Sequence, residues 1–321
     1  MTGGALVEHG GSAPSSARPK RWGIGGLRLD ALAACLGYRA LVGLLAALPL
    51  AAAAASLIGH HPRGDQVLWE PGGLWLLEAL RLAGPAFRSM APYGSVFLLV
   101  GACGWLLPLG ALVLSVGAGA RGRTWPELLG QAAGRFPTLA LLFGVTLLLQ
   151  TLVLALVTVS AVLLAASASS RSHGADALRI AGPCLGLVLA WGVGVVQDVL
   201  RVPVLQRDES LFKALATGWE LVRTGARNVL VAAAWRTALG LLTLGVAAAA
   251  GARLTGGEAD HVPLVAVLHL LALAAFVWLR GSWFHWLSRR LEALARPTDG
   301  DLGLEPAPRP AEPGTDQPSA G

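Results

Sequence analysis

Long apolar runs alternate with short polar segments along the middle of the chain. Six of these runs are long enough to cross the roughly 30 Å hydrocarbon core of a bilayer, which takes about 20 helical residues. They cover approximately residues 38–59, 93–118, 137–168, 178–204, 228–251 and 262–287. Because lipid offers the backbone no hydrogen-bond partners, such runs fold as α-helices. The pattern predicts an all-α, polytopic transmembrane helix bundle of about six spans, whose long third run tilts or extends beyond the membrane.

The two ends of the chain have a different composition. Residues 1–27 are rich in Gly, Ser, Ala and Pro, and residues 297–321 are rich in Pro with scattered acids. Such segments cannot bury enough apolar surface to become ordered. We therefore expect a disordered N-terminal tail, a six-helix transmembrane domain at 28–296 and a disordered, Pro-rich C-terminal tail.

Three shorter amphipathic segments lie between the spans, at 73–84, 124–135 and 208–223. The first predicts a helix on the outer membrane surface, and the other two predict short interfacial helices on the inner side. Thr124 and Glu127 form a T-x-x-E capping box at the start of the second segment. The apolar stripe of the third segment consists of Leu211, Phe212, Leu215, Trp219 and Val222.

Composition also indicates a membrane protein. Apolar residues make up 54% of the chain and charged residues 14%, against roughly 25% charged residues in a soluble domain. The mean hydropathy is +0.60. The net charge of +6 would suggest nucleic-acid binding in a soluble protein. Here the basic residues lie in short loops between apolar runs, so we interpret them as topology determinants and expect no nucleic-acid partner.

The basic residues orient the bundle. If the N-terminus is cytoplasmic, 17 of the 25 Lys and Arg residues lie in inside segments and 6 in outside segments, while Arg236 and Arg280 lie within spans. This bias predicts that both termini are cytoplasmic and that the number of spans is even. Tryptophans mark both predicted interfaces as an aromatic belt. They are Trp125, Trp219, Trp283 and Trp286 on the inner side, and Trp69 and Trp75 on the outer side.

One segment, at 197–228, resembles a known family. It contains Gln197-Asp198-Val199-Leu200-Arg201-Val202-Pro203-Val204, then Asp208-Glu209-Ser210-Leu211-Phe212-Lys213-Ala214-Leu215, Gly218-Trp219-Glu220 and Arg227-Asn228. The segment is an apolar span that ends in Asp-x-x-Arg, then a short helix, then a basic residue with Asn. This pattern resembles that of the uncharacterised bacterial six-span proteins related to the membrane domain of glycerophosphoryl diester phosphodiesterases. The resemblance implies six spans in the bacterial cytoplasmic (inner) membrane. It implies no hydrolase activity, because the catalytic barrel of that group is a separate domain.

Asp198 is the most informative polar residue, because it lies late in the fourth span. A charge in hydrocarbon costs at least a few kcal/mol unless it is paired or near water. Arg201 follows three positions later on the same helical face and can pair with it. We favour an ion pair that locks the span to its neighbour, and a polar site or proton-relay group is the alternative.

Other polar residues lie within the spans. Arg236 and Arg280 lie about two turns from the inner ends of the fifth and sixth spans, where they can snorkel inward, reach Asp198 or bind a substrate anion. His269 and Gln150 lie near the middle of their spans, where we expect interhelical hydrogen bonds, with proton relay as the alternative for His269. The candidate polar cluster therefore comprises Asp198, Arg201, Arg236, Arg280 and His269.

The sequence gives little support to other chemistry. His60, His61, Asp65 and Glu70 gather after the first predicted span, and we interpret them as a polar loop and not as a metal site. The three cysteines form no C-x-x-C motif, and no catalytic motif is found. We therefore expect no cofactor, no metal and no enzymatic activity. Glycines and prolines that interrupt the spans indicate either broken helices around a site or kinks and close helix packing.

Two functional classes remain. The first is a non-enzymatic structural, assembly or regulatory component of the inner membrane, with the lipid bilayer and other membrane proteins as partners. The second is a transporter or lipid-handling protein with a polar cavity in the inner half of spans four to six. A closed, paired cluster favours the first class, whereas an open cavity that reaches mid-bilayer favours the second.

The topology predicts the outcome of reporter fusions after residues 65, 122, 173, 210 and 256. We expect alkaline phosphatase, which is active only outside the cytoplasm, to be active at 65, 173 and 256 and inactive at 122 and 210. An active fusion at 122 or 210 would contradict the topology.

Overall fold

The computed structural model describes residues 23–24, 27–58, 74–120, 122–167, 173–254 and 262–295. These ranges contain the helices α1 (Leu29–Ile58), α2 (Leu74–Val116), α3 (Trp125–Gly134), α4 (Phe136–Ser167), α5 (His173–Gln206), α6 (Leu211–Leu254) and α7 (Val262–Leu294). A 3-10 turn, η2 (Ala118–Ala120), follows α2, and β1 (Gly23–Ile24) pairs antiparallel with β2 (Leu27–Arg28) before α1. Within the described ranges, six helices are long and apolar enough to cross a membrane. The predicted all-α fold with six spans is confirmed.

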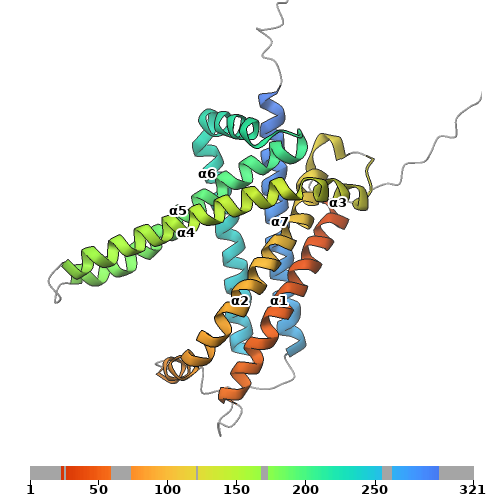
Figure 1. Ribbon diagram of the computed structural model, residues 1–321. Helices are drawn as coiled ribbons and strands as arrows, with labels where there is room; N and C mark the ends of the chain where they lie inside the picture. Colours follow the sequence, from red (N-terminus) through yellow and green to blue (C-terminus); the bar gives the residue numbers. More distant parts are fainter. Residues whose placement is uncertain are drawn as a thin grey trace, which may run out of the picture.

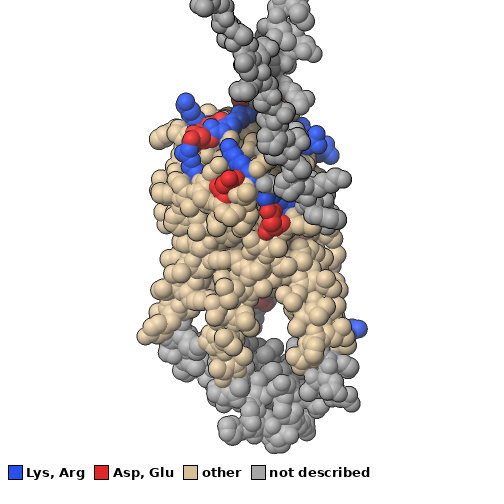
Figure 2. All heavy atoms as spheres, turned by 90° about the vertical axis from the view of Figure 1, so that its right-hand side faces the viewer, with Lys and Arg blue, Asp and Glu red and all other residues tan. Residues whose placement is uncertain are grey.

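The outer surface of these helices is apolar. On α4, Leu148 and Leu163 expose 71% and 64% of their surface, whereas the polar Asp198 on α5 is buried. This distribution is the reverse of that in a soluble domain, and it suits helices that face lipid. On the face shown in Figure 2, charged side chains gather at one end of the molecule, above a broad band that is almost free of charge.

The helices form two packing units (Figure 1). Helices α1, α2, α6 and α7 run alongside one another; α1 packs between α2 and α7, and α6 packs along α7. Helices α4 and α5 pair along their length as a hairpin that projects obliquely from this group. The 32 residues of α4 span about 48 Å at 1.5 Å per residue. Because this exceeds the hydrocarbon thickness, the length of α4 agrees with the tilt predicted for the third run.

Small residues on α5 let the two helices of the hairpin approach closely. A Cβ atom added at Gly182 would clash with Cβ of Ala161, and one added at Gly186 would lie 2.9 Å from Leu154 Cδ1. Helix α5 is continuous although Pro183 lies within it. Gly182 and Gly186 therefore serve close packing, and the alternative of a broken helix does not apply to α5.

The N-terminal part of the fold differs from the sequence prediction. The first span covers Leu29–Pro49 and begins nine residues before the predicted start. The charge of Asp30 hid the start of this apolar stretch, and Arg39, which is one of the 17 basic residues counted in the inside segments, lies within the span. Leu27, the last residue of the predicted tail, is buried and lies close to Gly281 of α7. Residues 1–22 and 296–321 lie outside the described residues.

The three amphipathic segments have different outcomes. Segment 124–135 is α3, whose capping box is present, with Glu127 Oε2 accepting a hydrogen bond from the Thr124 N–H at 2.5 Å. Segment 73–84 is not a separate helix, because its residues from 74 onward are the first part of α2. Residues 211–223 of segment 208–223 form the first part of α6, before a kink at Gly225. Its stripe is divided: Phe212, Leu215 and Trp219 are exposed, whereas Leu211 and Val222 pack against the core.

The packing of the hairpin predicts that Gly182→Ala lowers the free energy of unfolding by about 1–3 kcal/mol, because the added methyl group overpacks the α4–α5 contact. Gly192 is the matched control on the same helix, since a Cβ there would meet nothing within 4 Å. Gly192→Ala should be neutral or stabilise by up to about 1 kcal/mol through helix propensity. Thermal unfolding of the purified protein in detergent measures both, and equal effects would contradict the packing.

Candidate functional site

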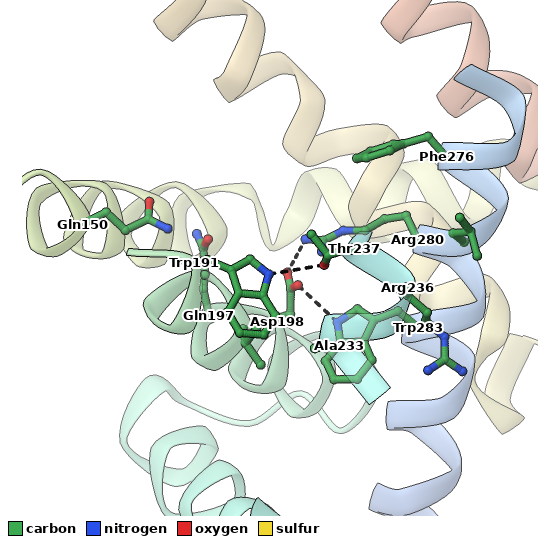
Figure 3. A pocket seen from close by; sticks show the side chains of 13 residues that line it. Gln150, Trp191, Gln197, Asp198, Ala233, Arg236, Thr237, Phe276, Arg280 and Trp283 are labelled. Atoms are coloured by element: carbon green, nitrogen blue, oxygen red, sulfur yellow. Dashed lines mark hydrogen bonds and ion pairs between the residues drawn. The ribbon is translucent and has the colours of Figure 1, made fainter. Parts of the chain in front are cut away.

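Asp198 lies where α5 meets α7, and its side chain is almost fully buried. Its Oδ1 atom accepts hydrogen bonds from Arg201 at 3.0 Å and from Arg280 at 2.6 Å. Its Oδ2 atom accepts a hydrogen bond from the indole N–H of Trp283 at 3.2 Å. Arg201 lies one turn further along α5, and Arg280 and Trp283 lie one turn apart on α7. One carboxylate therefore joins two helices through three donors, of which Figure 3 draws Arg280 and Trp283.

The structure brings together part of the candidate cluster. The expected i,i+3 ion pair of Asp198 and Arg201 is present, and Arg280 is the arginine that reaches Asp198. Arg236 bonds elsewhere: its Nε donates to Ser282 Oγ at 3.1 Å and its NH1 donates to the Ala232 carbonyl at 2.8 Å.

His269 lies apart from the cluster. It precedes Arg280 by three helical turns on α7, or roughly 16 Å along the axis. Its Nδ1 lies 2.8 Å from the Val265 carbonyl oxygen of the same helix. The interhelical hydrogen bond predicted for Gln150 is confirmed, because its amide donates from α4 to the Ala190 carbonyl on α5 at 3.0 Å. His60, His61, Asp65 and Glu70 lie outside the described residues.

A cavity of about 290 Å³ lies beside the Asp198 cluster. Residues of α4, α5, α6 and α7 line it, so it occupies the notch between the oblique hairpin and the α6–α7 pair (Figure 3). Phe276, Leu279 and Val195 give it apolar walls. Besides Asp198 and Trp283, its polar lining consists of Gln150, Trp191, Gln197, Arg236, Thr237 and Arg280.

Positive charge exceeds negative charge around this cavity. Arg236 and Arg280 line it, Arg201 lies behind Asp198, and Asp198 is the single acid in the lining. A fourth arginine, Arg39 of α1, lies within electrostatic range of Arg280. Because unbalanced charge in a membrane is costly, the site favours an anion over a neutral or cationic group.

Gln197 adds a hydrogen-bond donor to the site. Its side chain is 7% exposed and lines the cavity. Its amide nitrogen has no hydrogen-bond partner among the described residues. A buried donor without an acceptor costs about 1–3 kcal/mol, and a rotation of the amide toward the cavity would let an acceptor there recover this free energy.

Sequence reasoning missed several residues of the site. Arg39 stacks between the rings of Trp105, at 4.4 Å from the ring centroid, and Phe276, at 4.7 Å. Trp283 was interpreted only as part of the aromatic belt, although its position one turn after Arg280 places it on the same helical face. The indole of Trp191, which donates to Thr237 Oγ1 at 3.2 Å, carried no signal in the sequence.

The fold and the site define an α-helical, multi-pass integral membrane protein. Comparisons of the chain with protein-family models, curated protein sequences and solved structures found no match. The resemblance of segment 197–228 to six-span proteins related to the phosphodiesterase membrane domain therefore stays a prediction.

The buried cluster predicts that Asp198→Asn lowers the free energy of unfolding by about 3–5 kcal/mol, because Arg201 and Arg280 lose their anion in a buried environment. Asp176 provides a matched control. It pairs with Arg179 at the same i,i+3 spacing on the same helix, but the Asp176 and Arg179 side chains are 74% and 56% exposed.

For Asp176→Asn we expect a loss of at most about 1 kcal/mol, since exposed ion pairs contribute little. Denaturant unfolding in detergent and protein abundance in the membrane measure both variants. Similar losses at the two positions would show that burial of Asp198 is not what makes it important.

Proposed function

We propose that the protein is a non-enzymatic, lipid-handling membrane protein that holds the polar headgroup of an amphiphile in the notch between the α4–α5 hairpin, α6 and α7. The observation that carries this proposal is a polar cavity within the spans, beside apolar helix surfaces. Its volume of about 290 Å³ is just below the roughly 300–1,000 Å³ typical of ligand pockets. This size suits a headgroup and not a whole lipid.

The surroundings of the cavity suit the rest of an amphiphile. Next to Gln150 on α4, Leu149 and Leu152 are 44% and 60% exposed, and on α5 Leu187 and Val188 are each 60% exposed. Acyl chains can lie against these side chains while the headgroup reaches the arginines. A site with a charged end and an apolar approach fits an amphiphile better than it fits a small soluble solute.

We also propose that the protein resides in the bacterial cytoplasmic membrane with both termini inside. Two observations support this orientation. The predicted inside segments carry most of the basic residues, and on the face shown in Figure 2 the charged side chains of the described residues gather at one end.

A structural or assembly role is the second candidate, and a specific observation favours it. Both oxygens of Asp198 already accept hydrogen bonds from the protein, so the cluster is closed and needs no ligand. In that case the cluster would only hold α5 against α7. The two functions differ in one measurable respect, because only the first requires a bound amphiphile.

Lipid retention tests the proposal. The full-length protein, purified from bacterial membranes in a mild detergent and washed, should retain about one lipid per chain in mass spectrometry. Arg236→Gln should lower this retention about tenfold, since a hydrogen bond to a charged group contributes roughly 1.5–3 kcal/mol. Gln can still donate to Ser282, so we expect little change in stability.

Arg253→Gln is the matched control. Arg253 lies on the same helix, is exposed and does not line the cavity, so this variant should retain lipid like the unaltered protein. A washed protein that retains no lipid, with the fold intact, would contradict the lipid-handling function and leave the structural role.

A further inference from the structure

The cavity has hydrogen-bond donors on three helices. Gln197 lies on α5, Arg236 on α6 and Arg280 on α7, and all three line the cavity. The Arg280 side chain reaches across from α7 toward α5 (Figure 3). A phosphate group has several acceptor oxygens and can accept from donors on different sides at once, and guanidinium groups match phosphate geometry.

The same cavity offers little to a positively charged group. Asp198 is the single acid in the lining, its side chain is 2% exposed, and both its oxygens already accept hydrogen bonds. An ammonium or quaternary ammonium group would therefore meet Arg236 and Arg280 without a free carboxylate. One face of the Phe276 ring is also occupied by a cation, because the Arg39 guanidinium stacks on it at 4.7 Å.

We propose that the cavity selects phospholipids with a net negative headgroup over zwitterionic phospholipids, and that Gln197, Arg236 and Arg280 hold the phosphate. This inference rests on the proposed lipid-handling function and names its lipid class. The excess of arginine over aspartate favours the phosphate, and the same excess repels the ammonium that a zwitterionic headgroup carries. A neutral glycerol-type headgroup beyond the phosphate adds no such repulsion.

Competition between two lipids with the same acyl chains tests the selectivity. The delipidated full-length protein in a non-ionic detergent is mixed with equal amounts of dioleoyl phosphatidylglycerol and dioleoyl phosphatidylethanolamine, and the bound lipid is identified by native mass spectrometry. We expect phosphatidylglycerol to be retained at least about tenfold over phosphatidylethanolamine. Inorganic phosphate is tested separately as a competitor, and we expect it to displace phosphatidylglycerol only weakly.

Gln197→Leu separates a role in binding from a role in stability. The substitution leaves the surface charge unchanged and removes a buried amide nitrogen that has no partner among the described residues. The melting temperature should therefore stay the same or rise, while retention of phosphatidylglycerol falls about tenfold. Arg253→Gln serves again as the control that should bind like the unaltered protein.

The possible outcomes separate the inference from the function on which it rests. Equal retention of both lipids would overturn the selectivity and leave lipid handling intact, whereas retention of neither lipid would overturn both. Displacement of phosphatidylglycerol by an equal concentration of inorganic phosphate would assign the site to free phosphate and overturn the lipid class. Unchanged phosphatidylglycerol binding in Gln197→Leu would remove Gln197 from the proposed site.

Discussion

The α4–α5 hairpin is held against the rest of the molecule by polar contacts of the second half of α5, and the Asp198 carboxylate is the most buried of them. Beyond Asp198, Gln206 donates to the Val113 carbonyl at 2.9 Å and to Ser288 Oγ at 2.7 Å. At the same end, Arg207 donates to the Leu291 carbonyl at 2.7 Å. Lipid is as apolar as the helix surfaces, so the hydrophobic effect does not choose which helices meet within the bilayer. Directed polar contacts and close packing must therefore determine which helices meet. The polar contacts come from Asp198, Gln206 and Arg207, which we call the seam.

The position of the seam also shapes the cavity. The hairpin contacts α6 and α7 where Asp198 lies, and its oblique course carries it away from them toward its tip (Figure 1). Side chains would fill the notch if the hairpin ran parallel to α6 and α7. The oblique packing and the cavity are therefore one feature, and a change at Asp198 that alters how α5 meets α7 would also change the shape of the cavity.

Some of this arrangement could be predicted from the sequence. The spans were recognisable because lipid requires long apolar helices, and the pair of Asp198 with Arg201 followed from helical spacing. The face of the hairpin that packs against the other helices could not be predicted. Leucines occur on every face of α4, so the sequence does not distinguish a lipid-facing side from a packed one. Arg39 was counted with the inside basic residues because charge alone suggests a loop, although it lies within the first span. Arg39 is half-buried, and the two rings that it contacts, of Trp105 and Phe276, come from distant parts of the chain.

The structural and lipid-handling interpretations rest on the same imbalance of charge. Asp198 neutralises one arginine of the cluster, and the remaining positive charge is stabilised in part by aromatic rings, since Arg39 stacks on Trp105 and Arg236 lies 4.4 Å from the ring centroid of Trp235. Cation–π contacts reduce the cost of a buried cation but leave its charge in place. One arginine paired with Asp198 would be enough to hold α5 against α7. Further arginines beside an open cavity support the proposed binding of an anion from the membrane.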